Sequence, residues 1–199
     1  MENTGVADCR NTAGRPRCPG KDAAILTSAL TLLTQQGFTR MTLDAVARAA
    51  GVSKATIHLR FKTKTELAAA ALKTLRPCSR PPETGDALAD LVAQLADFAA
   101  TLTRTHGMSL IGTCLAEEAH TPELLAHFRE HAVQPRRTAV RRLLERARAQ
   151  GALAPDADPD ALTSALLGVF YADHLAGRAT DEDWAERAAA AVLGVRSHP

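Results

Sequence analysis

The clearest hydrophobic pattern in the chain lies between residues 41 and 61, where apolar positions recur at helical spacing on both sides of a glycine. A first helix is predicted by apolar residues three or four positions apart, namely Leu43, Val46, Ala47 and Ala50. A second helix is predicted by Ile57 and Phe61, which are four residues apart and share one face. Between them, Gly51 can adopt the positive φ that a tight turn between helices requires. The pattern therefore predicts two short helices joined by a tight turn.

The residues that flank this turn can cap both helices and leave one helix face free. Thr42 and Ser53 stand where a hydroxyl caps exposed backbone N–H groups, and Asp44 falls in the first turn of the first helix. With Ile57 facing inward, the outer face of the second helix carries Lys54, Ala55, His58 and Leu59. An exposed helix of this size fits the major groove of DNA, so the pattern predicts a helix-turn-helix DNA-binding unit.

Two further helices enclose this unit. Residues 21–37 carry apolar positions on one stripe and end at Gly37, and Thr63 with Glu66 forms a capping box that opens a helix through Leu72. Three prolines between residues 76 and 85 then end the helix and mark a boundary.

The remaining apolar pattern predicts five more helices and no strands. They cover about 86–105, 108–119, 121–150, 159–176 and 181–194, and Pro135 should kink or interrupt the third. The prediction is an all-α protein of about nine helices. Its parts are a flexible basic arm (1–20), a helix-turn-helix DNA-binding domain (21–76), a linker (77–85) and a ligand-binding and dimerisation domain (86–199).

From Lys21 to Leu72 the chain resembles the tetracycline-repressor (TetR) family of bacterial one-component regulators. The resemblance rests on a joint set of motifs in this order: Gly37-Phe38-Thr39, Thr42, Ala49-Ala50-Gly51-Val52-Ser53, Thr56-Ile57-His58, Arg60-Phe61 and Lys64 to Leu67. The family more often has Tyr at the place of His58 and Gly at the place of Ala55.

The resemblance implies a role for most of the exposed residues of the unit. Positions that commonly hold phosphates are matched by Thr42, Thr56, His58 and Lys64. Positions that approach base edges are matched by Lys54, Ala55 and Leu59, of which Lys54 can donate to guanine and the other two offer apolar contact. Ser53 and Arg48 complete the expected DNA-binding surface, with Arg48 as either a phosphate contact or solvated surface.

Charge is divided along the chain in a way that supports this interpretation. Residues 1–80 hold 13 Lys and Arg against 5 Asp and Glu, a net charge of +8, whereas residues 81–199 have a net charge of −6. The basic arm can follow phosphates or enter a minor groove, or it can be a solvated tail.

No apolar run approaches the length of a bilayer span, and the first 20 residues do not resemble a secretion signal, so we expect a cytoplasmic protein without a membrane partner. Four cysteines without metal-ligand spacing are expected to be free thiols: Cys9, Cys18, Cys78 and Cys114.

For the second domain, the resemblance implies a pocket for a small-molecule effector and a homodimer formed by the last two helices. It also implies that this homodimer binds a palindromic double-stranded DNA operator. Candidate pocket residues are Phe98, Met108, Ile111, Cys114, Leu115, Phe128, His131, Phe170, Tyr171 and His174. The alternative for each apolar member of this set is ordinary core packing.

The function expected is that of a ligand-responsive regulator, most often a repressor in this family, with no catalytic residues and no cofactor. One alternative is a metal- or redox-responsive regulator, since His127 and His131 are four residues apart and could share a metal. However, Glu130 stands beside the second histidine and not in the His-Glu-x-x-His order of zinc proteases. Paired histidines are also common on solvated helices, so no metal site is predicted. A second alternative is an enzyme built on the C-terminal helices, although no nucleophile and base are paired in the sequence.

Overall fold

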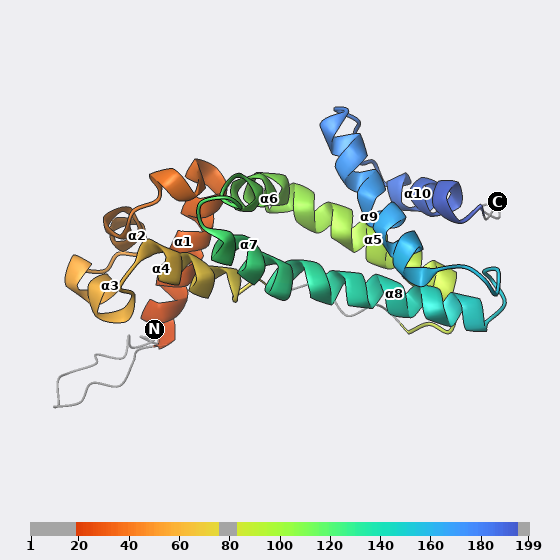
Figure 1. The fold of residues 1–199 in the computed structure, drawn as a ribbon, viewed down its shortest axis with the longest axis horizontal. Helices are drawn as coiled ribbons and strands as arrows, with labels where there is room; N and C mark the ends of the chain where they lie inside the picture. Colours follow the sequence, from red (N-terminus) through yellow and green to blue (C-terminus); the bar gives the residue numbers. More distant parts are fainter. Residues whose placement is uncertain (1–18, 76–82, 195–199) are drawn as a thin grey trace, which may run out of the picture.

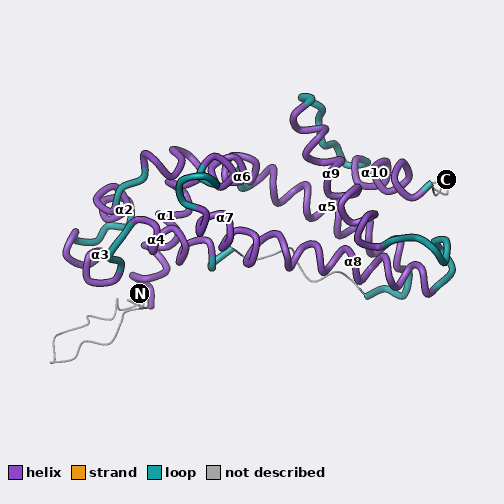
Figure 2. Tube along the Cα trace, in the orientation of Figure 1, coloured by secondary structure: helices purple, strands orange, loops and turns teal. Residues whose placement is uncertain are grey.

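The computed structural model describes residues 19–75 and 83–194, and in these residues it contains helices and no strands (Figure 2). This confirms the all-α prediction. The predicted basic arm, most of the linker, and Cys9, Cys18 and Cys78 lie outside the described residues.

Four helices form the N-terminal part of the molecule. They are α1 (Pro19–Arg40), α2 (Leu43–Ala49), α3 (Lys54–Arg60) and α4 (Lys64–Leu72). Gly37 has φ 78° and ψ 170°, so the regular part of α1 ends there, as predicted, and a short turn follows. The turn between α2 and α3 contains Gly51 at φ 64°, which confirms the positive φ expected from the sequence.

The C-terminal part consists of longer helices, of which α5 and α8 lie side by side along the long axis of the molecule (Figure 1). Their bounds are α5 (Ala87–Arg104), α6 (Gly107–Ala116), α7 (Pro122–Phe128), the π-helical turn η1 (Arg129–Val133), α8 (Gln134–Ala149), α9 (Pro159–Leu175) and α10 (Trp184–Leu193). The last helix begins three residues later than predicted, at Trp184, whose indole N–H donates to Asp173 at 3.0 Å.

The segment 122–149 is the long helix that the sequence predicts, interrupted by η1 immediately before Pro135. A proline in α-helical register has no N–H for the carbonyl four residues earlier, and its ring collides with that carbonyl. The π-helical turn changes the hydrogen-bond register at this point, while α7 and α8 continue along nearly one line (Figure 1). With α7, η1 and α8 taken together, the described residues form nine continuous helical segments, as expected.

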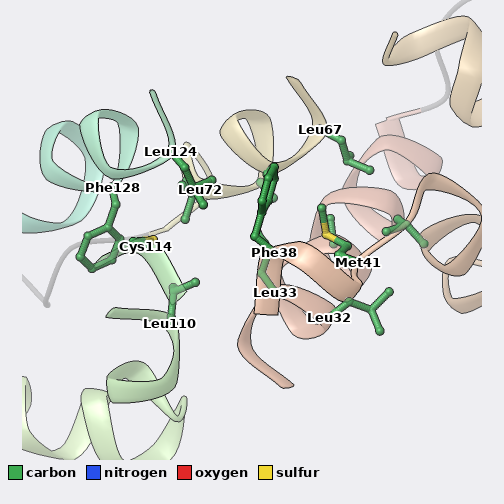
Figure 3. Packing of buried hydrophobic residues seen from close by; sticks show 14 of the residues in the cluster. Leu32, Leu33, Phe38, Met41, Leu67, Leu72, Leu110, Cys114, Leu124 and Phe128 are labelled. Carbon is green, nitrogen blue, oxygen red and sulfur yellow. The ribbon is translucent and has the colours of Figure 1, made fainter. Parts of the chain in front are cut away.

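Two hydrophobic cores hold these helices together. The first contains buried side chains of α1 to α4 and also of α6 and α7, among them Leu33, Leu72, Cys114 and Phe128 (Figure 3). The second joins α5, α8, α9 and α10 around Phe98 and Phe170. The first core thus includes helices on both sides of the predicted linker, because α6 and α7 pack directly against α1 and α4.

Candidate DNA-binding surface

The two helices of the turn motif are capped by the residues that the sequence selects. The Thr42 hydroxyl accepts a hydrogen bond from the Ala45 N–H at 3.1 Å, and the Ser53 hydroxyl accepts one from the Thr56 N–H at 3.2 Å. Each hydroxyl satisfies a backbone donor that the first helical turn leaves unpaired. The caps therefore fix where α2 and α3 begin.

Helix α3 is attached to the core by one face and exposed on the other. Ile57 has no exposed surface, whereas the Leu59 side chain is 79% exposed, the second most exposed large apolar residue among those described. Lys54, Ala55 and His58 are also exposed. The outer face that the sequence predicts is thus free to contact another molecule.

The charged end of α3 is held by an ion pair with α2. The Lys54 ammonium group donates to the Asp44 carboxylate, and this hydrogen bond lowers the pKa of Asp44 below its ordinary value of 3.8. The positive charges of Lys54, His58 and Arg48 act in the same direction on this carboxyl. Asp44 thus lies among the basic groups of the surface and orients Lys54.

Arg60 fixes α3 to α1. Its Nε donates to the Asp22 carboxylate at 2.5 Å, and its Nη1 donates to the Thr56 carbonyl at 3.2 Å. Because the Arg60 side chain is only 18% exposed, these contacts hold α3 in place against α1.

Lys64 has structural partners that the sequence does not reveal. Its ammonium group donates to the carbonyls of Phe38 and Thr39 at 3.0 and 3.2 Å and lies 4.3 Å from the centre of the Phe38 ring. It therefore stabilises the turn that ends α1. Lys64 also borders an open hollow of about 440 Å³ whose wall includes Thr42, His58 and Thr63.

The nine predicted DNA-binding residues all lie on or beside α2, α3 and the start of α4. Thr42, Arg48, Ser53, Lys54, Ala55, His58 and Leu59 are exposed, and Thr56 and Lys64 are half-buried. The hollow brings three of them together: Thr42, His58 and Lys64.

A larger cavity, of about 690 Å³, lies between the N-terminal helices and the C-terminal ones. Its lining comprises Leu30 and Thr34 of α1; Thr74 and Leu75 after α4; Asp97, Thr101, Leu102, Arg104 and Thr105 of α5 and its end; Gly107 and Leu110 of α6; and Phe128, Ala132 and Arg136. The lining mixes apolar side chains with threonine hydroxyls and charged groups, and its volume is in the range of roughly 300–1,000 Å³ typical of small-molecule sites.

Of the ten predicted pocket residues, Phe128 lines this cavity. Phe98 is buried in the second core and does not line the cavity, although the guanidinium group of the lining residue Arg136 lies 4.5 Å from its ring centre. Phe170 and Tyr171 contact Phe98 edge to face, and the exposed His174 is stacked on Phe170.

The other predicted pocket residues are dispersed. Met108 and Ile111 pack against the cores as half-buried residues, Leu115 is 53% exposed, and His131 lies on η1 beside His127. Cys114 is buried in the first core, and desolvation raises the pKa of its thiol to about 12. Such a thiol is not ionised near neutral pH, so it lacks the reactivity of a redox sensor.

Most of the cavity lining was missed from the sequence. The threonines and leucines of α1 and of the segment after α4 fit the pattern of an ordinary helix, and only the tertiary structure places them on a cavity that residues of α5 also line. Two polar lining residues, Thr34 and Thr101, were the signal in the sequence that could have indicated the cavity, since each stands close to the apolar stripe of its helix.

Comparison with known proteins supports a regulatory role. The family model described as "Bacterial regulatory proteins, tetR family" matches residues 25–71, and the one described as "Tetracyclin repressor-like, C-terminal domain" matches residues 81–192. The chain is 32% identical over 163 residues to the "Uncharacterized HTH-type transcriptional regulator YdeS" of Bacillus subtilis, covering 79% of this chain and 80% of that protein.

Solved structures have the same fold. The chain is similar to the TetR family transcription regulator SCO0332, with 29% identity, a TM-score of 0.61 and coverage of 89% of this chain and 99% of that one. It is also similar to the "Flavonoid-responsive Regulator FrrA", with 24% identity, a TM-score of 0.68 and coverage of 89% and 95%. In the described residues, no helix has the length and apolar character needed to cross a membrane.

Proposed function

Because the chain belongs to the TetR family of transcriptional regulators, we propose that it binds a palindromic operator as a homodimer, represses transcription, and is released by a small-molecule effector. The family assignment confirms a DNA-binding regulator that is not an enzyme. Repression, the dimer and release by an effector are the proposed steps. We expect the protein in the cytoplasm, where it can reach chromosomal DNA.

The observation that carries the proposal is the arrangement of α3. Its inner residue Ile57 is fully buried, its start is fixed by the Ser53 cap, and its outer residues Lys54 and Leu59 are exposed. A helix held rigidly by one face can place the other face against base edges in the major groove.

Phosphate contacts are expected beside α3, at the hollow bordered by Thr42, His58 and Lys64. The Thr42 and Thr63 hydroxyls cap α2 and α4 there, so the backbone at the start of both helices adjoins the hollow. Helix N-termini and basic side chains both favour a negatively charged phosphate.

The proposed dimer forms through the last two helices, α9 and α10, and α9 offers the most exposed apolar surface for it. Helix α9 exposes small apolar residues and one leucine along its length: Ala161, Ala165, Ala172, Leu175 and Ala176. Leu175 is 81% exposed, and an apolar face of this kind is stabilised when a second surface covers it. A two-fold dimer would place two copies of α3 in major grooves about 34–36 Å apart or a multiple of that distance.

The 690 Å³ cavity is the proposed effector site. It touches α1 and the end of α4, which hold the turn motif, as well as α5 and η1 of the C-terminal part. An effector that binds one arrangement of these helices more tightly shifts the protein toward that arrangement, and the spacing of the two α3 helices changes with it.

The lining favours an amphipathic effector, since it combines leucine and phenylalanine side chains with threonine hydroxyls and charged groups. FrrA is described as flavonoid-responsive, but its likeness to this chain shows the fold alone. The chemical class proposed here therefore rests on the cavity.

The proposal is tested by fluorescence anisotropy with DNA from the region beside the protein's own gene and with a shuffled sequence. We expect tight binding of two protomers to the native sequence only, and an altered sequence preference for Lys54→Ala. The exposed Lys73, at the far end of α4, gives the matched control Lys73→Ala. Equal affinity for native and shuffled DNA across a random-sequence selection would refute specific operator binding.

The effector site is tested with a library of small amphipathic molecules, using release of the labelled DNA as the readout. A hit should lose its effect in Thr101→Phe, which fills the cavity, and keep it in Thr31→Phe on the exposed side of α1. A hit that acts equally on both variants binds elsewhere.

A further inference from the structure

Three side chains that can bind a metal ion converge at the junction of α7 and η1. The Glu130 carboxylate lies 3.5 Å from His131 Nε2 and 3.9 Å from His127 Nδ1, and one ligand atom from each residue lies within 4.8 Å of the other two. The two imidazole rings are nearly parallel, at 11°, with centres 6.1 Å apart. All three side chains thus direct a donor atom toward one point.

The two histidine nitrogens have no hydrogen-bond partner among the described residues. His127 Nδ1 and His131 Nε2 are both buried, although the side chains themselves are 30% and 26% exposed. Buried polar atoms in folded proteins are almost always paired with another group, with water or with an ion. The neighbouring Arg129 does not compete for Glu130, because its guanidinium group donates to Glu118 at 3.1 Å.

The two separations that involve Glu130 are close to those of a tetrahedral metal ion. With metal–ligand bonds of about 2.0–2.1 Å, two ligands of a tetrahedral zinc ion lie roughly 3.4 Å apart. The 3.5 Å separation already has this length, and the 3.9 Å separation can close by rotation of the Glu130 side chain, which is 68% exposed. Two imidazoles and a carboxylate form a ligand set that suits zinc and neighbouring transition metals better than calcium or magnesium.

The sequence argued against a zinc protease because Glu130 is not in the position of the protease base, and it left a shared metal at His127 and His131 only as an alternative. In the structure its carboxylate takes the place of a ligand, since residues three and four apart on a helix share one face and η1 includes both Glu130 and His131. The missing protease order therefore excludes a catalytic base and not a bound ion.

We propose that His127, Glu130 and His131 bind one divalent transition-metal ion of the zinc class, with a fourth position open to water. The ion would join the end of α7 to η1. Phe128 and Ala132, which alternate with these ligands along the same segment, line the large cavity. Metal binding therefore stabilises one wall of that cavity, and it does so independently of the effector.

The site is tested by titrating the metal-free full-length protein with Co²⁺ and recording its visible absorption. We expect one Co²⁺ per chain, displaced by Zn²⁺, with a tetrahedral nitrogen and oxygen spectrum that lacks thiolate charge-transfer bands. Glu130→Gln should weaken binding at least about tenfold, and His131→Gln should abolish the spectrum. His120→Gln is the matched control, because His120 is exposed and lies outside the cluster.

Because Glu130 is exposed, Glu130→Gln should fold as the parent does, which circular dichroism of the metal-free protein verifies. Zn²⁺ should raise the unfolding temperature of the parent and of His120→Gln, and raise that of Glu130→Gln by clearly less. Equal Co²⁺ affinity in all variants, thiolate bands, or no stoichiometric binding would overturn the proposal. None of these results depends on operator binding, so they are separate from a failure of the proposed function.

Discussion

Replacement of Leu59 by alanine separates DNA contact from protein stability. The change removes three carbon atoms. Their complete burial would contribute about 2.4 kcal/mol of hydrophobic free energy, at ~0.8 kcal/mol per carbon. Because only about a fifth of the Leu59 surface is buried in the free protein, the free energy of unfolding should fall by no more than ~0.5 kcal/mol. If DNA covers the exposed remainder of the side chain, the variant loses up to ~2 kcal/mol of binding free energy, which is roughly a 25-fold increase in Kd.

Urea denaturation and fluorescence anisotropy at fixed salt concentration measure the two effects in parallel. Leu115→Ala is the control, because Leu115 is 53% exposed but lies on α6, away from the turn motif. A loss of unfolding free energy above about 1.5 kcal/mol would mean that Leu59 is packed and not exposed. An unchanged operator affinity would mean that the outer face of α3 does not contact the bases.

Three further predictions follow from the ionisable groups and their partners. Lys64→Ala should lower the free energy of unfolding by roughly 1–3 kcal/mol in urea denaturation, because two carbonyls lose a charged donor. It should also weaken binding to all DNA sequences alike, and a change in sequence preference would contradict this. Burial opposes ionisation of Asp90, but hydrogen bonds from Thr84 and Arg146 hold the pKa of Asp90 below its ordinary value of 3.8. The contribution of Asp90 to stability is therefore present above pH 3.8 and is lost as the pH falls through the lower pKa of the folded state. Asp90→Asn should therefore flatten the acid-induced loss of stability below about pH 4, and an unchanged acid-unfolding curve would contradict the assignment. The Cys114 thiol, with its pKa raised to about 12, should resist alkylation in the folded protein and react only after unfolding, as peptide mass mapping would show; rapid labelling at neutral pH would contradict its burial.

Local features of this protein could be predicted from the sequence because each depends on residues a few positions apart. The caps at Thr42 and Ser53, the positive φ of Gly51 and the two faces of α3 all follow from helical periodicity and from the side chains next to a helix end. The interruption before Pro135 follows from the covalent structure of proline. These features were sufficient to identify the fold and the helix that faces outward.

The contacts between distant segments were decided only by the tertiary structure. Lys64 donates to carbonyls 25 and 26 residues earlier, and Thr113 donates to the Leu33 carbonyl across 80 residues, which no periodicity encodes. In the same way, the 690 Å³ cavity combines residues of α1 and of the segment after α4 with residues of α5 to α8, whereas the sequence pointed to the aromatic residues that fill the second core. The physical reason is that periodicity determines which face of a helix is apolar, but the partner of that face depends on how all the helices pack together.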